Sequence, residues 1–110
     1  MIARMWNGRT CPEHADAYVT HLQQKTFPQL ASIPGHRGAY ILRRAQAGGI
    51  GLVEFTVITL WQSLDAITRF AGADPEVAVV PLEAQSLLAS YDDRAVHWEV
   101  AGIGEGTLCD

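Results

Sequence analysis

The chain has 110 residues, of which 48% are hydrophobic and 18% charged, and its formal net charge is -4 at pH 7. This length supports one domain with a single modest core, and the thin charged coat suggests that a second subunit hides part of the apolar surface. The acidic balance argues against a nucleic-acid partner and against an anionic membrane surface, because both require clustered cations.

The first strand is expected over residues 2–9, IARMWNGR. A helix should follow, because Thr10 and Glu13 have the spacing of a capping box and Pro12 suits a first helical turn. Pro28 should kink or end that helix, because proline lacks an amide proton and crowds the preceding turn. Helical spacing predicts its buried face: Ala15, Tyr18, Val19, Leu22 and Thr26.

The second strand is expected over residues 36–45, after the turn signal Ile33-Pro34-Gly35. Gly48-Gly49 provides a tight connection to the third strand, so these two strands should form an antiparallel hairpin. The third strand lies in residues 50–61, IGLVEFTVITLW, where few polar residues interrupt the apolar run. Both of its faces should therefore be covered.

A helix should follow the third strand directly, with Ser63 as its N-cap and Gly72 ending it in a left-handed conformation. Asp74-Pro75-Glu76 has the pattern of another helix start, which Pro81 would cut short. Residues 82–89 could add one or two helical turns. The fourth strand is expected over residues 94–101, RAVHWEVA.

The predicted order is strand, helix, strand, strand, helix, strand. This is the ferredoxin-like βαββαβ arrangement of the α+β class, a four-stranded antiparallel sheet with helices on one face. Because the third strand is apolar on both sides, a second copy of the same sheet is the simplest cover for the open face, and a homodimer is expected. The domain should span residues 1–101, followed by a flexible tail over residues 102–110.

The absence of any long apolar run predicts no membrane span and no signal peptide, so the cytoplasm is the expected location. Cys11 and Cys109 lie near opposite ends of the chain, and we expect neither a framework disulfide nor a metal site from them. His14, His21 and His36 show no metal-binding spacing and are expected at the surface. No Gly-rich phosphate loop supports a flavin or nicotinamide cofactor.

The segment FTVITLWQSLDAITRFAG, preceded by PGHRGAYILRR and followed by DPEVAV, resembles the antibiotic biosynthesis monooxygenase domain of the dimeric α/β-barrel group. The resemblance covers most of residues 1–101. It implies a homodimer whose sheets close face to face, with a cavity for a small apolar or aromatic ligand between sheet and helices. Known members include cofactor-independent oxygenases of aromatic phenols and quinones, haem-degrading enzymes, and proteins without an established activity.

The family's working residues transfer only in part. Trp61 matches a strand-end tryptophan that lines the pocket of quinone-forming members, but Val57 replaces their asparagine. Asn7 matches an asparagine of the haem degraders, whereas Phe70 and Val80 stand where those enzymes have a tryptophan and the iron-binding histidine. The resemblance therefore implies a monooxygenase without a cofactor. The alternatives are a non-catalytic binding protein and a haem-related member with a divergent site.

Three residues are the catalytic candidates, and each has a structural alternative. His97 could take a proton from a phenol or serve as a satisfied structural histidine. Asn7 could bond a ligand carbonyl or satisfy backbone groups. Trp61 could be a substrate platform or a packing anchor.

The binding candidates are likewise open to a second interpretation. Tyr40 could place its hydroxyl at the cavity wall or be an ordinary strand aromatic, and Trp6 could line the cavity or pack at the dimer interface, as could Trp98. Arg4 and Arg43 could hold an anionic ligand, although Arg43 could also extend beside Arg44. The predicted substrate-binding residues are Tyr40, Phe70, Arg43 and Trp6.

Overall fold

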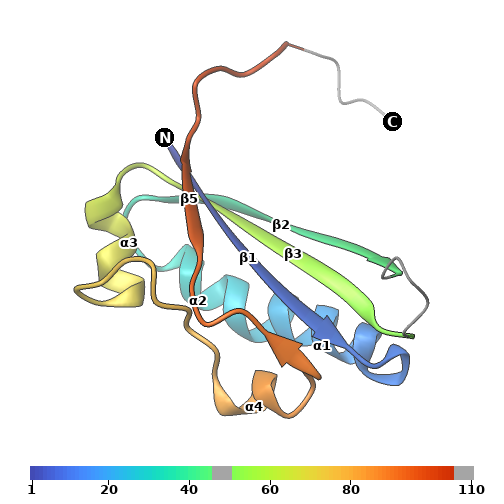
Figure 1. Ribbon diagram of the computed structural model, residues 1–110. Helices are drawn as coiled ribbons and strands as arrows, with labels where there is room; N and C mark the ends of the chain where they lie inside the picture. The colour runs from blue at the N-terminus through green and yellow to red at the C-terminus, as the bar shows by residue number, and fades with distance from the viewer. Residues whose placement is uncertain (46–50, 106–110) are drawn as a thin grey trace.

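The computed structural model describes residues 1–45 and 51–105. It contains one antiparallel sheet whose helices lie on one face (Figure 1), in the predicted α+β order. The strand order is β2-β3-β1, and β4 and β5 share the remaining edge of β1. The strands are β1 (Ile2–Thr10), β2 (His36–Ala45), β3 (Val53–Trp61), β4 (Ser90–Tyr91) and β5 (Val96–Glu99). The α-helices are α1 (Ala15–His21), α2 (Phe27–Ala31), α3 (Leu64–Ala71) and α4 (Leu82–Gln85).

The predicted capping box before α1 is wrong. Thr10 stays in β1 opposite Val53, and its hydroxyl is buried without a partner. The chain leaves the strand at Cys11 and makes a 3-10 turn over Pro12–His14, with no side-chain cap. Pairing with β3 keeps Thr10 in the strand, so the tertiary contact outweighs the local helix-start signal.

Pro28 does not end the helical run. Between α1 and α2 the chain forms a π-helical turn over Leu22–Thr26, and Pro28 sits in the first turn of α2. A π turn has wider hydrogen-bond spacing than an α-helix, and such turns accommodate a residue that breaks the regular pattern. The run therefore continues to Ala31 and covers the sheet over most of its length.

The hairpin of β2 and β3 is antiparallel as predicted, and β2 has a register shift between His36 and Gly38. The connection at Gly48-Gly49 and the predicted strand start at Ile50 lie outside the described residues. In β3 burial alternates: Phe55, Val57, Thr59 and Trp61 are buried, and the residues between them are half-buried. In a single chain β3 is thus fully covered on one face only.

Ser63 caps α3 as predicted, because its hydroxyl accepts from the Ala66 amide at 3.2 Å. The helix ends at Gly72, whose φ of 93° and ψ of -167° lie outside the expected left-handed helical region but in one that favours glycine. Gly35 packs close to this helix, since a Cβ there would lie 2.5 Å from the Ala66 Cβ. The turn before β2 is therefore fitted against α3.

The helix predicted from Asp74-Pro75-Glu76 does not form. Val77 bridges Arg94, and the Ala95 amide donates to the Glu76 carbonyl at 2.8 Å. β-branched valines and two prolines favour this extended course over a helix. The predicted fourth strand is shorter than expected, and its pairing with β1 resumes upstream in β4.

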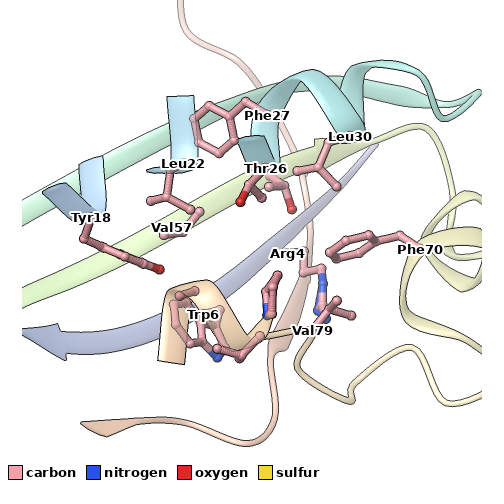
Figure 2. A pocket seen from close by; sticks show the side chains of 14 residues that line it. Arg4, Trp6, Tyr18, Leu22, Thr26, Phe27, Leu30, Val57, Phe70 and Val79 are labelled. Carbon is pink, nitrogen blue, oxygen red and sulfur yellow. The ribbon is translucent and has the colours of Figure 1, made fainter. Parts of the chain in front are cut away.

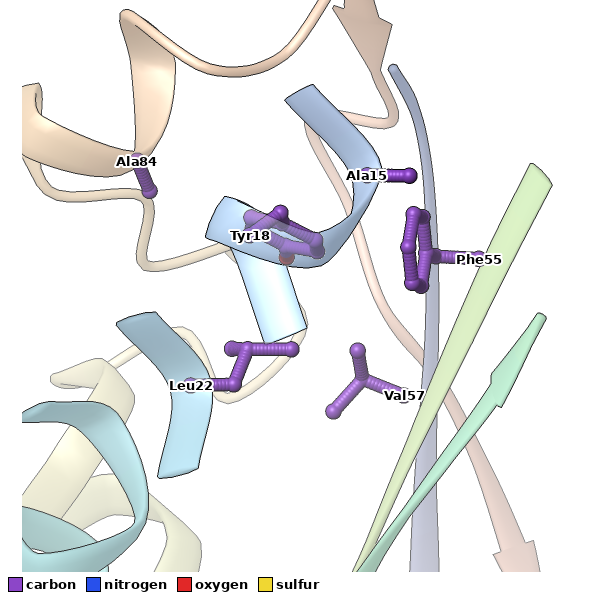
Figure 3. Close-up of a cluster of buried hydrophobic side chains, with 6 residues drawn as sticks. All are labelled: Ala15, Tyr18, Leu22, Phe55, Val57 and Ala84. Atoms are coloured by element: carbon purple, nitrogen blue, oxygen red, sulfur yellow. The ribbon is translucent and has the colours of Figure 1, made fainter. Parts of the chain in front are cut away.

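The main core lies between α1, the following π turn and β3 (Figure 3). The Tyr18 ring meets the Phe55 ring edge to face with centroids 5.0 Å apart, a favourable aromatic arrangement. A second cluster joins Leu30, Trp61, Ala66 and Ile67 beneath α3. Neither 1–45 nor 51–105 holds a helix of the length and apolarity that crossing a bilayer requires.

Candidate functional site

A cavity lies between the helix-covered face of the sheet and the helices (Figure 2). The space that the centres of water molecules can reach in it is about 70 Å³, several times what one water needs. Its floor comes from β1 and β3, one wall from the α1–α2 run, and the rest from α3 and the 79–84 segment. The lining is mostly apolar: Arg4, Trp6, Tyr18, Leu22, Thr26, Phe27, Leu30, Val57, Thr59, Phe70, Val79, Val80, Pro81 and Ala84.

Arg4 is the charged residue of this lining, and it is 5% exposed. Its Nη2 donates to the Val77 carbonyl at 2.8 Å, and its guanidinium carbon lies 5.6 Å from the centroid of the Phe70 ring. Its Nη1 is buried and has no hydrogen-bond partner. Burial lowers the pKa of Arg4, because desolvation disfavours the charged form.

Tyr18 contributes a hydroxyl to the same cavity, and Figure 2 shows its oxygen directed inward from the α1 side. Burial raises the pKa of this phenol well above its ordinary value of about 10, so it stays neutral and can donate a hydrogen bond. An apolar space with a few polar groups at its wall is the usual form of a small-molecule site.

Trp61 lies behind the cavity wall and is 0% exposed. Its ring stacks on Phe70 with centroids 6.0 Å apart, and its Nε1 donates to the Thr59 Oγ1 at 2.8 Å. His36 meets it edge to face at 5.1 Å and is half-buried, so it is less exposed than the predicted surface position. This geometry agrees with the packing interpretation of Trp61. Its contacts fix the positions of Phe70 and Thr59, which both line the cavity.

His97 pairs with Arg4 across β5 and β1, which puts its side chain on the helix-covered face. Trp98 consequently points to the open face, as the alternation along the strand predicts. His97 does not belong to the cavity lining, and its Nε2 is buried without a partner. Burial and, to a smaller extent, Arg4 lower the pKa of His97, so its imidazole is neutral at pH 7.

Asn7 and Tyr40 do not line the cavity, contrary to expectation. The register with β3 puts both on the open face of the sheet. Asn7 accepts from the Thr56 hydroxyl at 2.7 Å, and Tyr40 is 59% exposed. Arg43 is exposed at the sheet edge, where its Nη1 bonds Asp16 at 2.8 Å. The sequence identifies residues of this kind but not the face that the helices cover.

Two predicted binding residues, Trp6 and Phe70, do line the cavity. The Trp6 Nε1 donates to the Asp92 carbonyl at 2.6 Å, which fixes its ring. Two other lining residues, Tyr18 and Val79, were not predicted from the sequence as site residues. Tyr18 lies on the helix face predicted to be buried, so that pattern could have identified it; the extended course near Val79 left no such signal.

The lining offers haem no histidine ligand, because none of its residues is a histidine. Across the described part of the chain, no three histidine, cysteine or acidic side chains come together as a metal site.

Solved structures resemble this fold at low sequence identity. A Bacillus cereus protein provisionally assigned as an antibiotic biosynthesis monooxygenase matches with a TM-score of 0.67 and 12% identity, over 97% of each chain. A mutant of MhuD with two manganese protoporphyrin IX molecules per active site matches with a TM-score of 0.59 and 17% identity, over 96% of this chain and 100% of its own. The Streptomyces coelicolor monooxygenase from the gene ActVA-Orf6, solved with nanaomycin D, matches with a TM-score of 0.59 and 15% identity, over 96% of this chain and 92% of its own. No family model and no curated protein matches the chain.

Proposed function

We propose that this chain, which has the fold of antibiotic biosynthesis monooxygenase domains, binds a small aromatic molecule in the cavity and oxygenates it without a cofactor. The observation that carries the proposal is the mostly apolar cavity between sheet and helices, with a few polar groups at its wall. The S. coelicolor monooxygenase of the same fold was solved with nanaomycin D, which agrees with a ligand of this type.

The reaction balances without an added reductant. A phenol that has a hydrogen para to its hydroxyl combines with one O₂ to give a quinone and one water, so O₂ is the oxidant. The protein's part is to hold the ring, stabilise the phenolate and accept the phenol proton. Trp6 and Phe70 supply the aromatic walls and Arg4 the positive charge. The candidate base is neutral His97, which pairs with Arg4 across the strands but lies outside the cavity lining.

A non-catalytic binding protein is the second candidate. It is favoured by the lining itself, in which no carboxylate or imidazole stands ready to take a proton. The two candidates share the cavity and differ in turnover.

Oxygen uptake with 1-naphthol and anthrone separates them. We expect Val80→Trp, which fills the cavity from the 79–84 segment, to abolish both ligand binding and any uptake. Leu82→Trp is the matched control, because Leu82 is 81% exposed outside the cavity lining. Ligand binding without oxygen uptake would support the non-catalytic binding protein. Ligand binding that persists in Val80→Trp would show that the cavity is not the binding site.

We also propose that two chains pair through the open face of the sheet. Apolar side chains gather there and stay exposed: Tyr40, Leu42, Val96 and Trp98. Exposed apolar groups of this extent mark an interaction surface, and an identical sheet offers a complementary one. Sedimentation velocity over a range of concentrations should show dimers; monomers throughout would contradict this pairing. The cytoplasmic location remains a prediction.

A further inference from the structure

The buried guanidinium in the cavity lacks a partner of opposite charge. Several other arginines bond carboxylates, as Arg9 does with Asp92 at 3.0 Å and Arg44 with Glu54 at 2.9 Å. The exposed Arg37 and Arg69 bond neutral oxygens instead, but water can solvate their charges. Arg4, in contrast, is 5% exposed, and over residues 1–45 and 51–105 it forms no ion pair. A buried charge is costly unless it is paired, so this position calls for an anion.

The neighbouring charged groups do not provide that anion. Glu76 acts on the pKa of His97 and so lies in this neighbourhood, but its carboxylate bonds Arg94 at 3.2 Å and is exposed. His97 is neutral at pH 7 because burial and Arg4 lower its pKa. The described side chains around Arg4 therefore leave its positive charge uncompensated.

The guanidinium is held in a fixed orientation. The Val77 carbonyl takes one Nη2 proton, and the Phe70 ring lies against the group, with Trp61 stacked behind that ring. Nη1 remains buried, unpartnered and part of a cavity-lining residue. A fixed N–H donor with a positive charge in an apolar space binds an ionised oxygen strongly.

We infer that Arg4 binds the ionised oxygen of the ligand, so the cavity selects small aromatic anions over neutral aromatics of the same shape. This inference rests on the proposed ligand cavity and adds the charge state of what enters it. A phenolate and a carboxylate both present such an oxygen, and the following test includes one probe of each kind.

The test uses 4-nitrophenol, which ionises near neutral pH and is coloured only as the phenolate. Its pKa is measured by absorbance from about pH 5 to about pH 9 with and without excess protein. A positive charge within a few ångströms should lower the pKa of the bound phenol by about 1 unit or more. The neutral isostere 4-nitrotoluene reports on the cavity alone, and 4-nitrobenzoate is the carboxylate probe.

Arg4→Met keeps the length of the side chain and removes its charge, and Arg4→Lys restores a charge. We expect Arg4→Met to bind 4-nitrotoluene within about twofold of the parent, to abolish the pKa shift and to weaken 4-nitrobenzoate about tenfold or more. Arg4→Lys should recover part of both effects. Tighter binding of the phenolate or of the benzoate then identifies which oxygen the site prefers.

The outcomes are distinguishable. If 4-nitrotoluene binds but the bound phenol has an unshifted pKa, or one shifted equally in Arg4→Met, the inference is overturned while the proposed cavity stands. If neither 4-nitrotoluene nor either anion binds the parent protein, the proposed function and the inference fall together.

Discussion

The two faces of the sheet are incomplete in different ways. On the helix-covered face, Phe55 and Trp61 are fully buried, yet Arg4 is buried on the same face with no counter-ion. On the open face, polar groups have partners, as Asn7 has in Thr56, while apolar side chains such as Trp98, which is 57% exposed, have no cover.

The difference indicates what each face binds. An uncompensated charge in a mostly apolar cavity calls for a small ligand with one charged group. Exposed apolar area on the open face of a sheet calls for a second large surface, because only such a surface removes it from water. Added ligand should compensate the buried charge, and a higher protein concentration should cover the apolar face, so the two can be tested separately.

The largest expected effect separates the two tryptophans. Trp61→Ala should lower the free energy of unfolding by about 3–5 kcal/mol, because it removes a fully buried ring that supports Phe70. Trp98→Ala should change the stability of the dilute monomer by no more than about 0.5 kcal/mol. Urea unfolding at low concentration measures both, and equal losses would contradict the difference between the faces.

The next effect concerns association. Leu42→Asp should weaken the dimer about 100-fold or more, roughly 2.7 kcal/mol, because it would bury a carboxylate at the open face. Leu82→Asp is the matched control, since Leu82 is exposed on α4 at the helix-covered side. Analytical ultracentrifugation compares the two; similar dimers in both variants would remove the open face as the interface.

A smaller effect should appear at the cavity without ligand. Arg4→Met should raise the free energy of unfolding by about 1 kcal/mol, because relief of an unpaired buried cation outweighs the bond lost by the Val77 carbonyl. Arg9→Met, which breaks a pair with Asp92, should be neutral or slightly destabilising. Chemical denaturation of the two variants checks this, and a large loss of stability in Arg4→Met would show that Arg4 is structural.

The smallest effect is one of pH. Burial lowers the folded-state pKa of both His36 and His97, so between that pKa and the unfolded value near 6.5 the unfolded chain binds more protons. Above about pH 6.5 these histidines therefore do not lower the free energy of unfolding. As the pH drops below that value, protonation of the unfolded chain lowers it progressively. His36→Gln with His97→Gln should flatten this part of the stability profile, which acid-range unfolding of the two proteins measures. An unaltered slope in the double variant would contradict the assigned burial of these rings.

The sequence predicts the sheet well because alternation and turn residues are local signals. Ser63 caps α3 as expected, Gly72 ends it in a conformation other than the predicted one, and the alternation along β5 correctly separates His97 from Trp98. Alternation cannot say which of two faces the helices cover, and this is why Asn7 and Tyr40 were expected in the cavity.

The remaining errors arise where distant contacts override local signals. Thr10 has the spacing of a helix cap but pairs with Val53, and residues after Asp74 pair with the segment before β5. The helical run that walls the cavity makes a π turn just before Pro28, where the sequence predicts a kink or an end but not the continuation to Ala31. Arg4 shares its face with Ile2 and Trp6, so alternation predicts that it lies in the core. Alternation does not indicate that it would lack a counter-ion there.

The central claim is that the space under the helices holds an aromatic anion against Arg4. The most direct measurement is a structure of the protein with 4-nitrobenzoate bound. We predict the ring between Trp6 and Phe70, with a carboxylate oxygen at hydrogen-bond distance from the Arg4 Nη1. A ligand whose carboxylate turns away from Arg4, or one bound on the open face of the sheet, would contradict it.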